Sequence, residues 1–276
     1  MNKLLRMVAL TAAAVVIIGV GYIVFFNGIE AALRWYFLAT KFTASKVPNF
    51  AHNLRTGAEV TIKLTVISSI TGLILGLIAG ISRLSKNPLF RLPAQFYVWV
   101  IRGTPLLVQI LFAYNALPFL LDPVWKFLEP LGVPPIQDVL IPYWAAFIAL
   151  SVNVGAYNAE VIRAGIQAIA KGQWEAAMSL GMSPFQIMRY IIVPQAIKIV
   201  VPPLVNNIIA LLKDSSLASV ITLLELVHQG QRMISITFRP VEVYVAVAAI
   251  YLILTTVLTF FTDWLEREMA RRGATA

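Results

Sequence analysis

The chain contains no cysteine, and its only two histidines, His52 and His228, lie far apart in the sequence. Without a thiol the protein can form no disulfide bond, no cysteine-ligated metal site and no thiol nucleophile. Two distant histidines are also a poor basis for a metal centre, because a metal site needs several ligands in one place. We therefore predict no metal site.

The sequence also lacks the motifs of an enzyme. It has no glycine-rich loop suited to hold phosphates, no acid and base paired in one motif, and no nucleophile beside an activating partner. We predict no catalytic residue and no cofactor bound by this chain. If the protein uses ATP, the ATPase must be another polypeptide.

Charged residues are scarce. They make up 13% of the 276 residues, whereas 59% are hydrophobic, and the mean hydropathy is +0.80. A soluble domain of this length cannot bury so much apolar surface, so the composition predicts an integral membrane protein. The net charge of +9 comes from basic residues near the ends of apolar stretches, which favours contact with anionic lipid rather than nucleic acid.

Six apolar stretches predict an all-α bundle of about six transmembrane helices. They cover residues 7–29, 64–82, 104–121, 139–159, 191–212 and 243–262. Most are close to the length needed to cross a hydrocarbon core of about 30 Å. The first is longer than the core of a secretory signal and follows Lys3 and Arg6, so we expect an uncleaved span. Six crossings place both termini on one side, which we expect to be the cytoplasm.

The remaining segments predict shorter elements. We expect residues 30–57 to form an external loop in which a helix continues out of the first span. Residues 88–101 predict an amphipathic helix on the inner surface. Residues 122–138, which include four prolines, predict an external loop. Residues 217–224 are too short to cross and should fold back against the bundle.

Three small residues, Gly72, Gly76 and Gly80, recur every four positions in the second span. This spacing places them on one helical face, where another helix can approach closely. We interpret the glycines as a packing surface. At the third span, Thr104 is the expected N-cap and Pro105 the first helical residue.

A polar segment, residues 171–194, interrupts the apolar pattern. Residues 173–180 contain good helix formers, and Gly181 follows where a helix ends in a left-handed residue. Ser183 then offers an N-cap oxygen and Pro184 a suitable first helical residue. The segment predicts a bent pair of short helices.

This segment resembles the "EAA" loop of ABC-transporter permease subunits. The resemblance rests on Glu175-Ala176-Ala177, on Gly181, and on Ile191-Ile192-Val193-Pro194 at their spacing. It implies a coupling helix that docks in a cleft of a cytoplasmic ATP-binding subunit, which would carry the ATP and magnesium. The residues expected at this contact are Gly172, Trp174, Glu175, Ala176, Ala177, Gly181, Ser183 and Phe185.

Two further strings narrow the resemblance. Residues 102–109, which begin Arg102-Gly103-Thr104-Pro105, and residues 155–160 are similar to permeases of polar amino-acid uptake systems, which are type I importers. The similarity covers roughly residues 55–268. It implies an N-terminal part at 1–57, a permease domain at 58–268 and a cytoplasmic tail at 269–276. It also implies two protein partners: a second permease chain, identical or related, and an extracytoplasmic solute-binding protein. The implied substrate is an amino acid, and the implied location of the protein is the cell inner membrane.

Polar residues in the apolar stretches are candidates for a substrate path, because each is costly in lipid and should face the bundle interior. They are Gln109, Asn115, Asn153, Tyr157, Glu160, Asn206 and Asn207. Asn153, Tyr157 and Glu160 share one helical face. The same residues are consistent with hydrogen bonds between helices, and Glu160 with neutralisation of Arg163.

Lys213, Asp214 and Ser215 end the fifth stretch. They fit either an outer gate or a capped helix end with a solvated charge pair. Three other functions also stay open: an ATP-independent transporter or channel, a membrane anchor, and an ABC permease for another solute.

Overall fold

The computed structural model is helical throughout most of its described part. It describes the backbone of residues 2–40, 42, 47–128, 132, 134–136 and 140–274, and the side chains of 21–40, 42, 49–127, 132, 134–136 and 140–267. The long helices are α1 (Asn2–Ala39), α2 (Val47–Leu84), α7 (Pro142–Gln167), α10 (Val193–Asp214) and α12 (Pro240–Ala274). The shorter elements are α3 (Pro88–Arg102), α4 (Leu106–Asn115), α5 (Leu117–Leu128), α8 (Lys171–Ser179), α9 (Pro184–Gln186), the π-helical η2 (Ile187–Ile192), the 3₁₀-helical η3 (Ser215–Ile221) and α11 (Leu226–Thr237).

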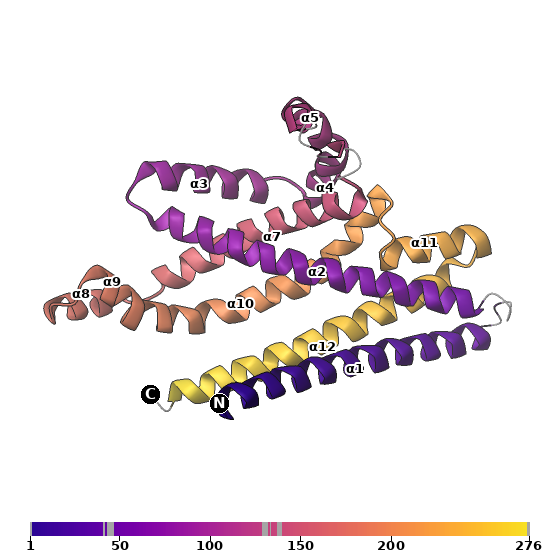
Figure 1. The fold of residues 1–276 in the computed structure, drawn as a ribbon, viewed down its shortest axis with the longest axis horizontal. Coiled ribbons are helices and arrows are strands. Elements are labelled where there is room, and N and C mark those ends of the chain that lie inside the picture. Colours follow the sequence, from indigo (N-terminus) through magenta and orange to yellow (C-terminus); the bar gives the residue numbers. More distant parts are fainter. Residues whose placement is uncertain are drawn as a thin grey trace.

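The long helices run roughly along one axis. Helices α2, α7 and α10 form the centre, and α1 and α12 lie antiparallel to each other beside it (Figure 1). Helices α8 and α9 extend from one end and α11 lies at the other. Both chain termini lie toward the α8 end, as an even number of crossings requires. That this end faces the cytoplasm stays a prediction.

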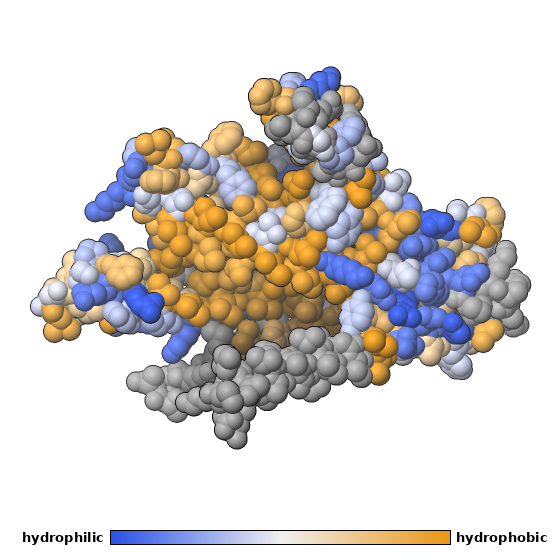
Figure 2. All heavy atoms as spheres, in the orientation of Figure 1, coloured by the Kyte–Doolittle hydropathy of each residue, from blue (hydrophilic) through white to orange (hydrophobic). Residues whose placement is uncertain are grey.

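Five helical segments of the described part are long and apolar enough to cross a membrane. They are Asn49–Leu84, Leu106–Phe127, Pro142–Gln167, Pro184–Ile221 and Pro240–Arg267. Figure 2 shows apolar side chains over the middle of the molecule and hydrophilic ones gathered toward its two ends. These segments match five of the six predicted spans. The remaining one, at residues 7–29, lies within α1, where the first twenty side chains are outside the described residues.

Helices α2 and α7 pack most closely where the three glycines lie. A Cβ atom added to Gly72 would lie 2.2 Å from Cγ1 of Val154, and one added to Gly76 would lie 2.5 Å from Cβ of Asn158. At Gly80 the added atom would lie 2.9 Å from a backbone oxygen of α7. Such distances leave no room for any side chain. The predicted packing surface is confirmed.

Helix α3 differs from the prediction of a helix on the inner surface. It lies lengthwise against α2 and α7, with Ala94 and Val98 buried against Ala79 and Ala156. The Tyr97 hydroxyl donates a hydrogen bond of 2.6 Å to the carbonyl of Val152. One face of α3 therefore meets protein, whereas its large apolar side chains, among them Phe96 and Trp99, are exposed on the other side.

Several predicted boundaries were also wrong. Helix α2 begins at Val47 rather than near residue 64, and residues 122–128 belong to α5 rather than to a loop. The third span is interrupted at Ala116, between α4 and α5. Pro123 lies inside α5, where it removes one backbone donor without ending the helix. Residues 129–131, 133, 137 and 138 of the predicted loop lie outside the described residues.

Two other predicted segments agree with the structure. Helix α1 continues to Ala39, as expected for a helix that extends out of the first span. The apolar residues after α10 form η3, which packs against α4 and α7. Thr222, with φ 62°, then reverses the chain toward α11.

The glycine packing gives a matched pair of substitutions. Gly76→Ala should lower the free energy of unfolding by about 1 to 3 kcal/mol, because the added methyl group overlaps α7. Gly28→Ala, on an exposed face of α1 with nothing within 4 Å, should be neutral or stabilising because alanine favours helices. Thermal unfolding of the two purified variants tests this, and equal stability would contradict the packing role of Gly76.

Candidate substrate cavity and coupling surface

The segment between α7 and α10 folds as the predicted pair of short helices. Helix α8 begins at Lys171, two residues before the expected start, and Gly181 follows it with φ 74°. Ser183 caps the next helix: its hydroxyl accepts from the Gln186 amide at 3.3 Å, and its own amide donates to the Gln186 side chain at 2.8 Å. This reciprocal capping box fixes the direction in which the chain re-enters the bundle.

One side of the pair packs on the bundle. Ala177 is buried and Trp174 half-buried against a small apolar cluster that includes Ile169, Ile187 and Ile192. The prediction that both alanines let another surface approach was therefore wrong for Ala177, because its methyl group belongs to the core of the segment itself. Ala176, in contrast, faces outward.

The other side is exposed and partly apolar. Met178, Leu180 and Phe185 are 56%, 81% and 75% exposed, and Glu175 lies exposed among them. Gly172, Gly181 and Ser183 line the same end of the molecule, the two glycines being exposed as well. Large apolar side chains at a hydrophilic end of a membrane protein indicate a surface that a partner covers. We call the exposed faces of α8 and α9 the coupling surface, after the role that the sequence predicts for this segment.

Glu160 of α7 holds an ion cluster with three arginines from three helices. Its carboxylate binds Arg83 of α2 at 2.5 Å and the neighbouring Arg163, and Arg102 of α3 lies 3.5 Å away. The Arg102 guanidinium also lies over the Tyr157 ring, 5.3 Å from its centroid. The predicted pairing of Glu160 with Arg163 is confirmed, but the cluster also joins α2, α3 and α7.

A break in the helices follows Arg102. The Thr104 hydroxyl donates to the carbonyl of Val100 at 3.0 Å, and the capping position of α4 is taken by Pro105, so the predicted N-cap role of Thr104 was wrong. The Gln109 amide nitrogen instead donates to the carbonyls of Ile101 and Thr104. Its oxygen accepts from Asn153 at 2.9 Å. Gln109 therefore satisfies the interrupted backbone and ties it to α7.

A polar cavity of about 390 Å³ lies beside this break. Helices α4, α7 and α10 and η3 line it with Thr104, Pro105, Leu106, Asn153, Val154, Tyr157, Asn207, Ala210, Leu211, Asp214 and Leu217. Asn207 donates a 2.9 Å hydrogen bond to the Asn158 side chain, which fixes the direction of its amide. Asp214 is half-buried and forms no ion pair with any described residue. We call this space the polar cavity.

The polar cavity gathers some of the predicted path residues and not others. Asn153, Tyr157 and Asn207 line it, and Gln109 and Glu160 hold its wall from behind. Asn115 ends α4 and donates to its own helix at Leu111, and Asn206 points away, exposed. Neither belongs to the lining.

The three residues at the end of α10 also separate. Asp214 faces the polar cavity, whereas Lys213 lines a groove with α12. Ser215 is buried and its hydroxyl donates to the carbonyl of Leu212 at 2.7 Å. The sequence grouped the three either as an outer gate or as a capped helix end with a solvated charge pair, but successive residues of a helix point in different directions.

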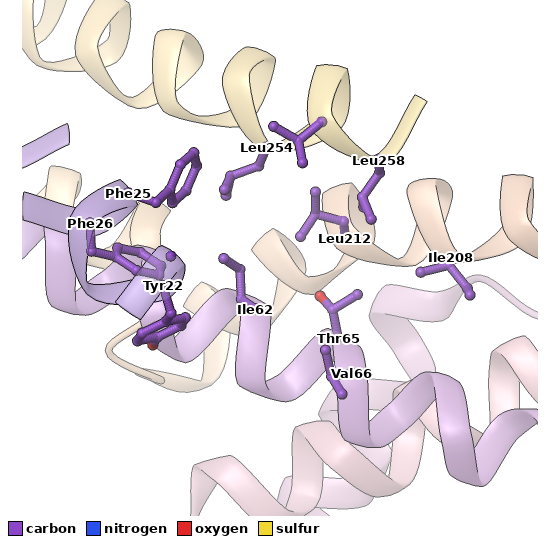
Figure 3. A pocket seen from close by; sticks show the side chains of 12 residues that line it. Tyr22, Phe25, Phe26, Ile62, Thr65, Val66, Ile208, Leu212, Leu254 and Leu258 are labelled. Carbon is purple, nitrogen blue, oxygen red and sulfur yellow. The ribbon is translucent and has the colours of Figure 1, made fainter. Parts of the chain in front are cut away.

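A second cavity, of about 370 Å³, is apolar. Side chains from α1, α2, α10 and α12 converge on it (Figure 3), and the Thr65 hydroxyl in its wall donates to a carbonyl of its own helix. This cavity offers little that recognises a polar solute. The polar cavity, in contrast, combines hydrogen-bonding groups with a carboxylate.

A bundle of helices that are long and apolar enough to cross a membrane, with a polar cavity between them, is the architecture of membrane permeases. Residues 72–271 match the family of binding-protein-dependent transport system inner membrane components, and the chain belongs to that family.

Similar proteins with curated names are also permeases. The glutamine transport system permease protein GlnP of Escherichia coli (strain K12) is 39% identical over an alignment that covers 77% of this chain and 91% of GlnP. The arginine transport system permease protein ArtQ of Bacillus subtilis (strain 168) is 38% identical over 77% and 90%. The octopine transport system permease protein OccM of Rhizobium meliloti is 37% identical over 79% and 89%.

Solved structures show the same fold. A chain in the crystal structure of an amino acid ABC transporter with histidines superposes with a TM-score of 0.69, at 37% identity, over 83% of this chain and 99% of its own. An inward-facing MetNI methionine ABC transporter gives a TM-score of 0.62 at 20% identity, over 79% and 96%. The latter similarity is one of fold alone.

The ion cluster gives a stability prediction. Glu160→Ala leaves Arg83 and Arg163 without their partly buried partner, so the free energy of unfolding should fall by about 1 to 3 kcal/mol. Glu175→Ala, on the exposed coupling surface, should change it by less than about 0.5 kcal/mol. Thermal unfolding of both variants in detergent tests this, and an unaffected Glu160→Ala protein would show that the arginines do not depend on this carboxylate.

Proposed function

We propose that this chain is the permease subunit of an ATP-driven importer and that its polar cavity passes amino acids across the cell inner membrane. The observation that carries the proposal is the chemistry of the polar cavity: one carboxylate, Asp214, with amides from two helices and a guanidinium at its edge. The amino-acid and amino-acid-derived solutes in the names of the curated relatives support this class of solute, as does the amino acid ABC transporter of similar fold.

An amino acid is a zwitterion, so its site needs an acceptor for the ammonium group and donors for the carboxylate. Asp214 supplies the acceptor, because a charge-assisted hydrogen bond to an ammonium is strong where water is excluded. The Asn207 amide and Arg102 supply donors on other parts of the wall. The side chain of the solute would then meet Leu106, Ala210 and Leu217.

Coupling to ATP follows from connectivity. The coupling surface lies between α7 and α10, and these two helices carry Asn153, Tyr157, Asn207 and Asp214. A push on α8 is passed to both helices because Trp174 and Ala177 pack with Ile166 at the end of α7 and with η2, which continues into α10. Cytoplasmic ATP-binding subunits that hold ATP and magnesium would supply this push. The cavity would then alternate between inward- and outward-facing forms.

The remaining assembly is inferred from family membership. A second permease chain, identical or related, would complete the transporter, and a solute-binding protein would deliver the amino acid on the outer side. In this arrangement the α8 end and both termini face the cytoplasm.

Loss of coupling is the first test. Glu175→Lys reverses the charge at the centre of the coupling surface without touching the bundle, so the ATP-binding subunit should no longer co-purify from detergent-solubilised membranes. Glu266→Lys, an exposed acid near the end of α12, is the matched control and should retain it. Mass spectrometry of the purified complexes reads the result. Recovery of the ATPase with the Glu175→Lys chain would contradict the proposed contact.

The second test addresses the polar cavity. Asp214→Asn removes the ammonium acceptor, so the KM for amino-acid uptake into proteoliposomes should rise by about 10- to 100-fold, as expected when a charged hydrogen bond of about 1.5 to 3 kcal/mol is lost. Asn207→Ala should also raise KM, whereas Asn206→Ala, one residue away but outside the lining, should not. Equal effects of the two asparagine variants would contradict the assignment of the cavity.

A further inference from the structure

A buried carboxyl group lies at the outer end of the bundle, outside the polar cavity. Glu225 is fully buried and precedes α11 as its N-cap. Its two oxygens accept from the amides of Val227 and His228 at 2.9 and 2.7 Å. The Tyr251 hydroxyl of α12 donates to it at 3.3 Å. One acidic side chain therefore joins α11 to α12.

The start of α11, next to Glu225, also contacts α2. The Leu226 amide, next to Glu225, donates to the Thr61 hydroxyl at 3.3 Å. Gly57 lies so close that an added Cβ would be 2.9 Å from Cα of Leu226. The backbone at the start of α11 therefore packs directly on α2 at Gly57, which has no side chain.

The buried Glu225 is also linked to the polar cavity. The helix η3 packs against α11 and α2, and its first residue, the buried Ser215, directly follows Asp214 at the end of α10. A chain of contacts therefore runs from Glu225 through the start of α11 and η3 to the residue that supplies the carboxylate of the cavity. We call Glu225, Tyr251, Thr61 and Ser215 the outer node.

No described residue forms an ion pair with Glu225. The titratable side chain that contacts Glu225 is Tyr251 of α12, and α2 contacts the start of α11 through the uncharged Thr61. The elements around the site also carry Arg55, Glu59 and Lys63 of α2, His228 and Arg232 of α11, Lys213 and Asp214 of α10, and Glu242 and Tyr244 of α12. Burial raises the pKa of Glu225 to about 7, although its backbone and hydroxyl donors favour the ionised form. The group is therefore poised to change its charge near neutral pH.

We propose that Glu225 is a positioning residue that acts through α11 and η3 on the outer wall of the polar cavity, and that its ionisation loosens that wall. The neutral carboxyl group suits the fully buried site. The carboxylate favours an arrangement in which water reaches the outer node, because a buried charge without a cation is costly. The effect on uptake rests on the proposed function; the effect on the outer node does not.

Proton linkage gives the direction of the pH effect on the outer node. Glu225 binds its proton more tightly in the buried arrangement than in a hydrated one, where its pKa returns toward 4.5. The buried arrangement is thus fully favoured below the ordinary pKa, and this advantage is lost as pH rises through the raised value near 7. Between pH 6 and pH 8 the hydrated population should rise about tenfold.

Because this chain has no native cysteine, a single thiol introduced into it reports opening through labelling of this chain. Leu223→Cys places one thiol beside the outer node, at a side chain that is 7% exposed. Gln231→Cys places one on the exposed face of α11 and corrects for the reactivity of the thiol itself. The ratio of their maleimide labelling rates should rise about tenfold from pH 6 to pH 8. Adding Glu225→Gln should abolish the rise, whereas adding Glu242→Gln, an acid of α12 paired with Arg239, should preserve it.

Uptake by the reconstituted transporter gives the second measurement. In the native chain KM should rise between pH 6 and pH 8 as the wall that holds Asp214 loosens, and Glu225→Gln should keep the lower KM throughout. A labelling ratio that does not change with pH in the native background would overturn the inference, even if the Glu225→Gln protein failed to fold. Absence of uptake by the native transporter at every pH would instead overturn the proposed function and leave the labelling test decisive.

Discussion

The close approach of α2 and α7 is the constraint on which the rest of the structure depends. Gly72, Gly76 and Gly80 remove every side chain from one stripe of α2, so that the two backbones nearly touch. In lipid, packing of this kind replaces the hydrophobic effect as the force that joins helices. Because α7 also lines the polar cavity and leads into α8, its fixed position on α2 provides the reference against which the other cavity helices are placed.

Charges reinforce this arrangement where it nears the coupling surface. Glu160 draws Arg83, Arg102 and Arg163 together from α2, α3 and α7. One carboxylate cannot neutralise three guanidinium groups, and Arg102 compensates by lying over the Tyr157 ring. The cluster thus leaves positive charge at one edge of the polar cavity, while Asp214 provides negative charge elsewhere on its wall.

The sequence is most informative where one local rule decides the structure. The glycine spacing predicts a face of α2 on which another helix packs closely, and Ser183 with Pro184 predicts the start of α9, because both features depend on neighbouring residues. That the partner helix is α7 is shown by the structure. It is least informative where a tertiary partner decides. An apolar face such as that of α3 looks the same whether lipid or α7 covers it. The polar residues pose the same difficulty, since periodicity cannot tell Asn207, which lines the cavity, from the adjacent Asn206.

Residues that act across the bundle are the hardest to predict from the sequence. An acid before a helix, such as Glu225, is usually an exposed cap. The importance of Glu225 comes from Thr61 and Tyr251, which are close to it only in the fold.

One continuous helical segment links these parts. From Pro184 to Ile221 the chain passes from the coupling surface, along the polar cavity, to the outer node without a non-helical residue. A rod of this kind transmits displacement from end to end, so the position of Asp214 depends on both of its ends. The buried Ile187 and Ile192 fix the inner end through apolar contact, whereas the outer end is fixed by the packing of η3 against α4 and against α11, which begins at Glu225. Apolar contacts do not respond to protons, but the outer attachment includes a carboxyl group that titrates near neutrality, so the outer end is the one that pH can adjust.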